Sequence, residues 1–242
     1  MAKKQFYDFN LTISPNLSLY DDLAPFKETL RKLGYNGAVV EIPLDPIPNF
    51  KPLEYHSKDS FFFFRTTLQS SNIETLKTQL AKIRRKRHII AALCTSVQIT
   101  KWITLDHRVD ALRFEGDNYK LFDLATARDA AATGKVLEIP MRQIIYIPSY
   151  KRIMIIRYIS KAIQTAFVKK CPVIISSGAT TPMELRSPRD LAALTNLFEL
   201  DYFLAIDSIS TIVQDLLERN HRKLSTEFIA PNIWHAKGEN SG

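Results

Sequence analysis

The sequence has few of the residues that mark nucleotide-binding loops, disulfide frameworks and membrane spans. Only 7 glycines occur in 242 residues, and none are spaced as in a Walker A loop or a dinucleotide-binding fingerprint. The two cysteines, Cys94 and Cys171, form no CxxC pair, so we expect no zinc site, no disulfide and a reducing, intracellular setting. No apolar run approaches the roughly 18 residues of a membrane span, and no signal-peptide core follows the first residues. We therefore expect a soluble protein that is not secreted and has no membrane partner.

The usual signatures of hydrolase active sites are missing as well. The 5 histidines are scattered singly and form no HxH or HExxH pair that would fix two imidazoles on one metal. No serine or cysteine stands in a strand-turn-helix elbow such as GxSxG. Asp8 and Asn10 share one face of the first predicted strand, but asparagine is a poor ligand for a catalytic metal. We expect no catalytic residue and no bound metal in this chain.

Short apolar, β-rich runs alternate with helical periodicity from one end of the chain to the other. The chain is 45% apolar and 24% charged, which is enough to bury one sizeable core. Repeated strand-helix units build a parallel sheet, and eight such strands would close an α/β barrel. The predicted strands are residues 6–13, 37–42, 61–68, 88–93, 109–114, 135–139, 172–176 and, with the weakest pattern, 202–206.

Helices are predicted between and after these strands. Ile73, Leu76 and Leu80 recur at helical spacing and form one apolar face. Ser187 and Asp190 suit a helix start, because a capping hydroxyl and a carboxylate three residues later satisfy free backbone N–H groups. The predicted helices are residues 17–33, 72–87, 96–104, 121–132, 150–169, 187–198 and 208–221.

No linker rich in glycine, serine or charge divides the chain, so we predict a single domain over residues 1–242. Residues 43–59 contain four prolines and are predicted to form an irregular loop. The helical pattern fails after about Lys223. Residues 224–242 are therefore predicted to be an extended C-terminal segment whose polar end frays.

Basic charge is concentrated in two segments. Lys and Arg number 33 against 25 Asp and Glu, which gives a net charge of +8. Residues 82–113 hold 8 Lys and Arg against 2 Asp, and residues 135–170 hold 8 against 1 Glu. Such local charge favours binding of RNA or DNA through counterion release. The alternative is structural, because the cations at 84–87 end a predicted helix and would offset its dipole.

The segment after the seventh strand is predicted to bind an anion. Arg186 and Arg189 stand beside the helix start at Ser187, on the side of the barrel where parallel strands end. In the alternative interpretation, Arg186 forms an internal ion pair with Glu184 or Asp190 that fixes the loop.

The same segment carries a resemblance to a known family. The runs IISSGA at 174–179 and ELRSPRDL at 184–191 closely resemble the thirty-kilodalton protein subunit of ribonuclease P, called protein component 3 in archaea. The resemblance extends to FYDFN at 6–10, LGYNGAVV at 33–40, VDAL at 109–112, LEI at 137–139, SIS at 208–210 and NHRK at 220–223. It covers most of the chain and is weakest between residues 43 and 104.

The resemblance implies a TIM-like α/β barrel related to the polymerase and histidinol phosphatase barrels. It implies a role in the ribonucleoprotein endonuclease that removes 5′ leaders from precursor tRNA, in which the RNA subunit performs the hydrolysis with bound magnesium. The implied partners are the ribonuclease P RNA, precursor tRNA, other ribonuclease P proteins and a small ferredoxin-like subunit that forms a heterotetramer with this chain. The short ELRSPRD form is more typical of archaeal members, which implies a cytoplasmic location, or a nuclear one in a eukaryote.

Together, charge and resemblance predict that the chain binds RNA and that it binds no cofactor itself. The predicted RNA contacts, chosen for motif, local charge and position, are Arg186, Arg189, Arg113, Arg128, Arg142, Lys169 and Lys170. Two other functions stay open. A barrel phosphoesterase would place Asp8, Glu41, Glu138 and a histidine around a divalent metal ion. A protein scaffold would only hold the small partner, with its basic surface solvated.

Overall fold

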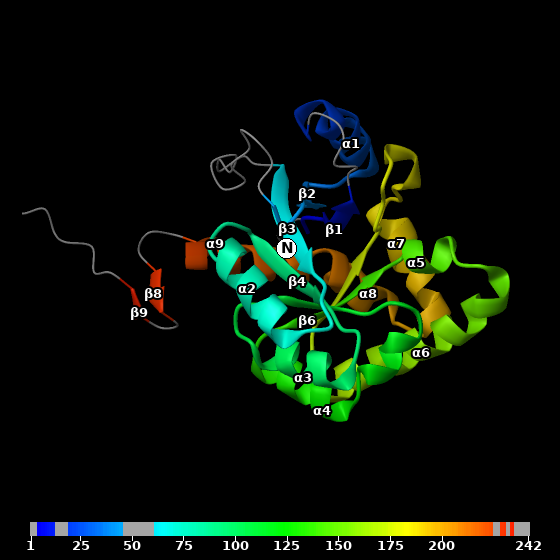
Figure 1. Cartoon of the computed structure of the whole chain (residues 1–242). Helices are drawn as coiled ribbons and strands as arrows, with labels where there is room; N and C mark the ends of the chain where they lie inside the picture. The colour runs from blue at the N-terminus through cyan, green and yellow to red at the C-terminus, as the bar shows by residue number, and fades with distance from the viewer. Residues whose placement is uncertain (1–3, 13–18, 46–60, 225–227, 231–232, 235–242) are drawn as a thin grey trace, which may run out of the picture.

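The computed structural model describes residues 4–12, 19–45, 61–224, 228–230 and 233–234. Its central sheet has seven strands, all parallel, and each strand pairs with the next one along the chain (Figure 1). The strands are β1 (Tyr7–Thr12), β2 (Gly37–Glu41), β3 (Phe62–Leu68), β4 (Ile89–Leu93), β5 (Ala111–Arg113), β6 (Val136–Pro140) and β7 (Val173–Ser176).

The sheet curls until its last strand meets its first. Leu11 in β1 bridges to Ala179, just beyond β7, and the backbone N–H of Thr12 donates to the Ala179 carbonyl over 2.9 Å. The carboxylate of Asp8 accepts the backbone N–H of Ser177 over 3.1 Å at the same seam. The chain is therefore a nearly closed α/β barrel, as the strand-helix alternation predicted.

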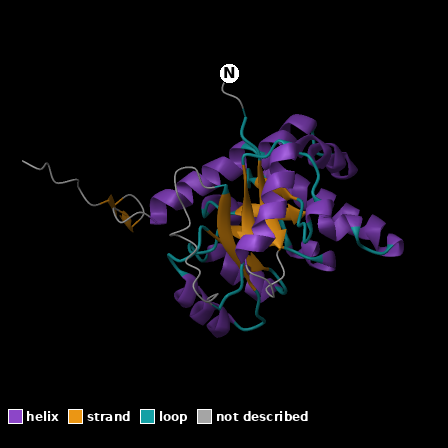
Figure 2. Cartoon of the chain, turned by 90° about the horizontal axis from the view of Figure 1, so that it is seen from above, coloured by secondary structure: helices purple, strands orange, loops and turns teal. Residues whose placement is uncertain are grey.

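Helices surround the strands, which stand at the centre of the molecule in the view from above (Figure 2). Asn72, Ser96 and Asp123 cap three of the helices with side-chain oxygens that accept backbone N–H groups. The α-helices are α1 (Leu19–Leu33), α2 (Ile73–Ile83), α3 (Val97–Leu105), α4 (Leu124–Ala132), α5 (Arg142–Ile145), α6 (Ser149–Val168), α7 (Pro188–Leu194), α8 (Tyr202–Ile209) and α9 (Thr211–Leu224). The short 3-10 helices are η1 (Gly116–Leu121), η2 (Pro182–Glu184) and η3 (Thr195–Phe198).

The prediction of an eighth strand at 202–206 is wrong, because these residues begin α8. Asp201 caps that helix, and its carboxylate accepts the backbone N–H groups of Phe203 at 2.9 Å and Leu204 at 3.3 Å. A short apolar run suits a strand or a buried helix equally well, and the capping carboxylate decides between them. The barrel consequently closes from β7 directly to β1.

Two apolar layers hold the barrel together. The larger one lies between the strands and the outer helices and includes Phe64, Leu80 and Ile159. The smaller one is formed by side chains on the other face of the strands, such as Val39 and Ile174. They pack with Val213, Leu216 and Leu217 of α9. Asn220 of α9 donates to the carbonyl of His88, which precedes β4. Helix α9 therefore covers the end of the barrel at which the strands begin.

The predicted C-terminal segment is described only in part. Strands β8 (Phe228–Ala230) and β9 (Ile233–Trp234) pair antiparallel and extend beyond α9 (Figure 1). Most of the predicted loop at 43–59, the start of the predicted helix at 17 and the rest of the segment 224–242 lie outside the described residues. None of the described helices is long and apolar enough to cross a membrane.

Candidate functional site

Polar side chains line the end of the barrel at which the parallel strands finish, which is where sites form in this architecture. Asn10 of β1, Glu41 of β2, Arg65 of β3 and Glu138 of β6 all take part. The side-chain amide of Asn10 donates to Oε1 of Glu138 over 2.9 Å. These residues form one hydrogen-bonded network, which we call the mouth network.

Arg65 holds the mouth network together. Its Nη2 lies 2.7 Å from Oε2 of Glu138, and its Nε lies 3.0 Å from Oε2 of Glu41. Its Nη1 donates to the carbonyl of Phe9 over 3.1 Å, and its guanidinium lies 5.0 Å from the centre of the Phe9 ring. Burial alone would lower the pKa of Arg65, but the charges of Glu138 and Glu41 raise it. A permanent cation therefore sits between the two carboxylates.

This arrangement does not favour the phosphoesterase hypothesis. Glu41 and Glu138, which that hypothesis assigns to a metal ion, are instead neutralised by the guanidinium of Arg65. The histidines of the described chain, His88, His107 and His221, precede strands or end α9, at the opposite end of the barrel. Within the described residues, no group of three or more His, Cys, Asp or Glu side chains is placed to hold a metal ion. His56 and His235 lie outside the described residues.

Asp8 lies where β1 meets the residues that follow β7, at the point where the barrel closes. It is fully buried, and its Oδ1 accepts the backbone N–H groups of Asn10 at 3.2 Å and Ser177 at 3.1 Å. Burial raises the pKa of Asp8 to about 6. The carboxylate thus joins the first strand to the end of the last one.

The segment between β7 and α7 is held in place from several directions. Glu184 accepts the backbone N–H of Thr180 over 2.7 Å and the Nη1 of Arg142 over 3.1 Å. Burial pushes the pKa of Glu184 upward, but the Thr180 hydrogen bonds and the Arg142 charge hold it below its ordinary value. The hydroxyl of Tyr35 donates to the carbonyl of Arg186 over 2.9 Å. This segment therefore presents its side chains from a fixed backbone.

The helix start after this segment has the cap that the sequence predicts. Ser187 Oγ accepts the backbone N–H of Asp190 over 3.2 Å and donates to the Asp190 carboxylate over 2.7 Å. Arg186 pairs with neither Glu184 nor Asp190. Its Nη1 donates to the carbonyls of Met183 at 3.1 Å and Leu185 at 2.8 Å, so the alternative of an internal ion pair is wrong.

Four of the predicted RNA contacts meet on this rim, which we call the strand-end rim. Arg113 ends β5, Arg142 follows β6, and Arg186 and Arg189 follow β7. Arg113 pairs with Glu115 at 3.0 Å. The Arg189 side chain is exposed and bonds to no group in the described part of the chain.

The other three predicted contacts lie elsewhere. Arg128 is on the exposed face of α4 and pairs with Asp129 at 2.8 Å. Lys169 and Lys170 follow α6 and precede β7, so they lie at the opposite end of the barrel. The fold therefore divides the seven cations into a rim group and three that stand apart from it.

Sequence reasoning missed Arg65. It lies inside the strand predicted at 61–68, and the signal that could have found it is a charged residue between Phe64 and Thr66. A cation in a buried strand requires carboxylates as partners, and Glu41 at the end of β2 and Glu138 within β6 are such carboxylates.

Comparison with known proteins agrees with this geometry. A family model described as RNase P subunit p30 matches residues 5–225. The chain belongs to this family. Among the curated relatives of this p30-family chain is ribonuclease P protein component 3 of Methanosarcina mazei, which is 25% identical over 228 residues, or 91% of this chain and 92% of the relative. The resemblance predicted from the sequence motifs is confirmed.

Solved structures support the fold of this p30-family chain. A chain in a cryo-EM structure of archaeal ribonuclease P with mature tRNA is similar with a TM-score of 0.71 and 18% identity, covering 93% of this chain and 98% of that one. A prolidase complexed with N-methylphosphonate-L-proline is similar with a TM-score of 0.56 and 8% identity, covering 96% and 78%. At such identities the likeness establishes the α/β barrel and nothing about chemistry.

Proposed function

We propose that this p30-family chain is a protein subunit of ribonuclease P, the ribonucleoprotein that removes 5′ leaders from precursor tRNA. The observation that carries the proposal is the family match over residues 5–225. Two features of the barrel support it. The mouth network is occupied by Arg65 instead of a reactive centre, and four arginines stand on the strand-end rim.

In this proposal the RNA subunit performs the hydrolysis with bound magnesium, and this chain provides neither nucleophile nor base. Folding of the RNA and docking of its substrate bring phosphates together, and their repulsion opposes both steps. A stiff surface carrying cations lowers that repulsion and with it the magnesium concentration that the RNA requires. Arg189 suits this role because its side chain is exposed and unpaired within the described chain.

We further propose the partners that the family resemblance implies. These are a small ferredoxin-like subunit, forming a heterotetramer with this chain, and the other ribonuclease P proteins. The archaeal relatives support a cytoplasmic location for the assembly. Size-exclusion chromatography with light scattering on the mixed subunits measures the stoichiometry directly, and a mass other than two copies of each would contradict the heterotetramer.

The test of the proposed function is reconstitution from purified parts. Chain, ribonuclease P RNA and small partner subunit are mixed, each is omitted in turn, and removal of the 5′ leader is followed over a magnesium series. We expect cleavage to disappear without the RNA and to need more magnesium without this chain. The chain alone should leave precursor tRNA intact. Cleavage by the RNA-free chain, or a reaction indifferent to the chain at every magnesium concentration, would refute the proposal.

A further inference from the structure

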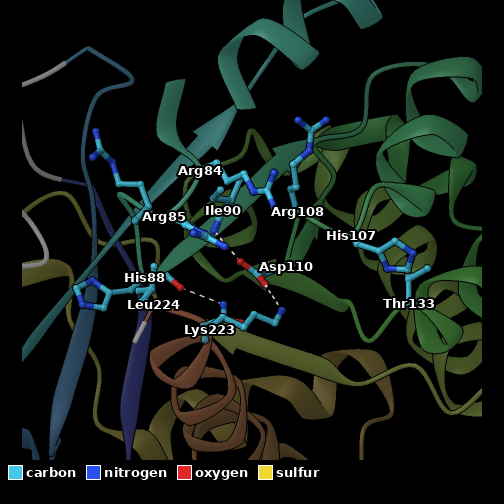
Figure 3. A pocket seen from close by; sticks show the side chains of 12 residues that line it. Arg84, Arg85, His88, Ile90, His107, Arg108, Asp110, Thr133, Lys223 and Leu224 are labelled. Atoms are coloured by element: carbon cyan, nitrogen blue, oxygen red, sulfur yellow. Dashed lines mark hydrogen bonds and ion pairs between the residues drawn. The ribbon is translucent and has the colours of Figure 1, made fainter. Parts of the chain in front are cut away.

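A second basic surface lies at the end of the barrel where the strands begin, opposite the strand-end rim. It is a pocket of about 270 Å³ between the turn after α2, the turns before β5 and β6, and the last turn of α9. Figure 3 shows Arg84, Arg108 and Lys223 around Asp110, each from a different segment. We call it the strand-start pocket.

Some cations of the strand-start pocket are already used by the fold. Arg87 donates from Nε to the hydroxyl of Thr66 over 2.9 Å and from Nη2 to the carbonyl of Pro43 over 3.1 Å. Arg108 binds both carboxylate oxygens of Asp106, at 2.9 Å and 2.6 Å. These two arginines have structural partners that account for their positions.

Arg84 and Arg85 have no such partners. Both are exposed, and neither guanidinium bonds to any group in the described part of the chain. Asp110 is the carboxylate of the pocket lining, and it is already engaged. Its Oδ2 accepts the backbone N–H of Ile90 at 3.0 Å, and its Oδ1 lies 3.1 Å from Arg219 and 3.9 Å from Lys223. The pocket therefore has an excess of positive charge that the described protein groups do not neutralise.

Two lysines in or beside the pocket have lowered pKa values. Burial lowers the pKa of Lys223, and the nearby charge of Arg219 lowers it further against the opposing pull of Asp110. Lys135, whose ammonium donates to the Asp106 carbonyl at 2.8 Å, has its pKa lowered by burial to about 8. Burial is the main cause of both shifts, and burial disfavours a charge of either sign. The unpaired guanidinium groups of Arg84 and Arg85 are therefore what favours an anion here.

The backbone of Arg85 is left-handed at the end of α2. Its φ is 62°, in the left-handed region, directly after the cap of α2. Glycine is the residue best suited to this position, because a side chain there is sterically disfavoured. A left-handed residue directly after the cap is a common way for a helix to end, so the end of α2 accounts for this conformation. Arg85→Gly is therefore a change that the backbone tolerates.

We propose that the strand-start pocket binds a phosphate group of the RNA backbone, so that the protein contacts RNA at both ends of its barrel. Guanidinium groups match phosphate oxygens with paired hydrogen bonds. Phe, Tyr and Trp do not contribute to the described lining of the pocket, which favours backbone recognition over base stacking. The inference rests on the proposed ribonuclease P function and specifies where the RNA lies on this chain.

The test compares a pocket variant, Arg84→Ala with Arg85→Gly, with an exposed-arginine control, Arg157→Ala on α6. Arg157 is exposed and has no bonded partner in the described chain. Binding of the ribonuclease P RNA is measured by fluorescence anisotropy over a potassium chloride series. We expect the pocket variant to lose roughly tenfold in affinity at low salt, and its slope of log K against log salt to flatten by about 1 per lost phosphate contact. A loss no larger than that of Arg157→Ala overturns the inference.

Stability measurements keep the test falsifiable. The change Arg85→Gly relieves the left-handed backbone, so its urea midpoint should stay the same or rise while RNA affinity falls. Glu199→Gly, also at a left-handed residue with φ 59°, controls for the backbone effect without loss of a cation. If Arg85→Gly unfolds the protein, Arg84→Ala alone carries the binding test. A fall in stability with unchanged RNA binding would assign these arginines to the helix end.

Two further arms separate the possible outcomes. Titration with inorganic phosphate tests whether the pocket binds a free anion instead of RNA. Micromolar affinity for phosphate, together with a salt slope of RNA binding that the pocket variant leaves unchanged, would reveal a site for a small ligand. That result would refute the proposal. The reconstituted cleavage assay distinguishes the two levels of inference. If the unaltered chain does not affect cleavage, the proposed function fails. If it supports cleavage and the pocket variant behaves like the control in binding, only this inference fails.

Discussion

At the residue scale, Arg65 determines what the barrel mouth can do. Its guanidinium is fully buried between Glu41 and Glu138, so removing it leaves two carboxylates without their cation. Breaking a buried pair in this way typically costs about 3–5 kcal/mol. We expect Arg65→Met to lower the free energy of unfolding by that amount in urea titrations, whereas Arg128→Met on the exposed face of α4 should change it by less than about 0.5 kcal/mol.

A double variant distinguishes this electrostatic cause from simple loss of packing. Adding Glu138→Gln to Arg65→Met removes one of the two uncompensated charges, the fully buried one, and keeps an oxygen for the amide of Asn10. The double variant should therefore recover part of the lost stability. If the stability losses of the two single variants simply add in the double variant, Arg65 stabilises the fold by packing. The charges of the mouth network would then be only weakly coupled.

Asp8 gives the protein a measurable dependence on pH. Its pKa is raised from 3.8 to about 6 by burial, so the folded state prefers the protonated acid. The stabilisation from this preference is complete at low pH and is lost as pH rises through 6. Asp8→Asn lacks this titration, so its stability relative to the natural chain should improve by about 1 kcal/mol between pH 5 and pH 7. Urea midpoints of both proteins at the two pH values measure this, and a constant difference would rule out a raised pKa.

At the scale of elements, the regular alternation of β-rich runs with helical periodicity predicted seven strands and most helices. The prediction for 202–206 was wrong because a short apolar run fits a strand or a helix, and here the carboxylate of Asp201 caps a helix. The candidate site was harder to predict than the strands and helices. The cap at Ser187 could be predicted from its local sequence, whereas the partners of Arg65 lie on β2 and β6, and only the closed barrel brings them together.

The segment between β7 and α7 depends on Gly178. Its φ is 66°, and a Cβ there would lie 3.1 Å from Cβ of Arg142 and 3.2 Å from Cβ of Pro140. Gly178→Ala combines a left-handed alanine with crowding and should destabilise the chain by more than about 1 kcal/mol. Gly116→Ala is the matched control, because φ is 53° there and nothing lies within 4 Å of the added carbon. Equal urea midpoints for the two variants would show that the contacts with Arg142 and Pro140 relax without cost.

At the scale of the whole molecule, the proposed role is electrostatic, so its effects should depend on the ions present. Magnesium and protein cations both offset phosphate repulsion, which means that the protein contribution matters most when magnesium is scarce. Of the two motif arginines, Arg186 donates to the carbonyls of Met183 and Leu185, while Arg189 is exposed and unpaired within the described chain. Arg189→Ala therefore removes a charge without breaking a hydrogen bond of the described chain. The double variant, Arg186→Ala with Arg189→Ala, removes both motif charges and should have the larger effect.

We expect Arg189→Ala and the double variant to slow leader removal by the reconstituted particle at low magnesium. Neither should change the rate at saturating magnesium. An exposed ionic contact contributes up to about 1 kcal/mol, so the loss for Arg189→Ala should reach about fivefold. Raising the magnesium concentration should restore cleavage, because the defect lies in phosphate repulsion and not in chemistry. Arg157→Ala and circular dichroism of each variant control for general charge and for folding. If the folded double variant follows the same magnesium curve as the natural chain, the strand-end rim does not contact RNA at these arginines, and the strand-start pocket becomes the leading site for RNA contact.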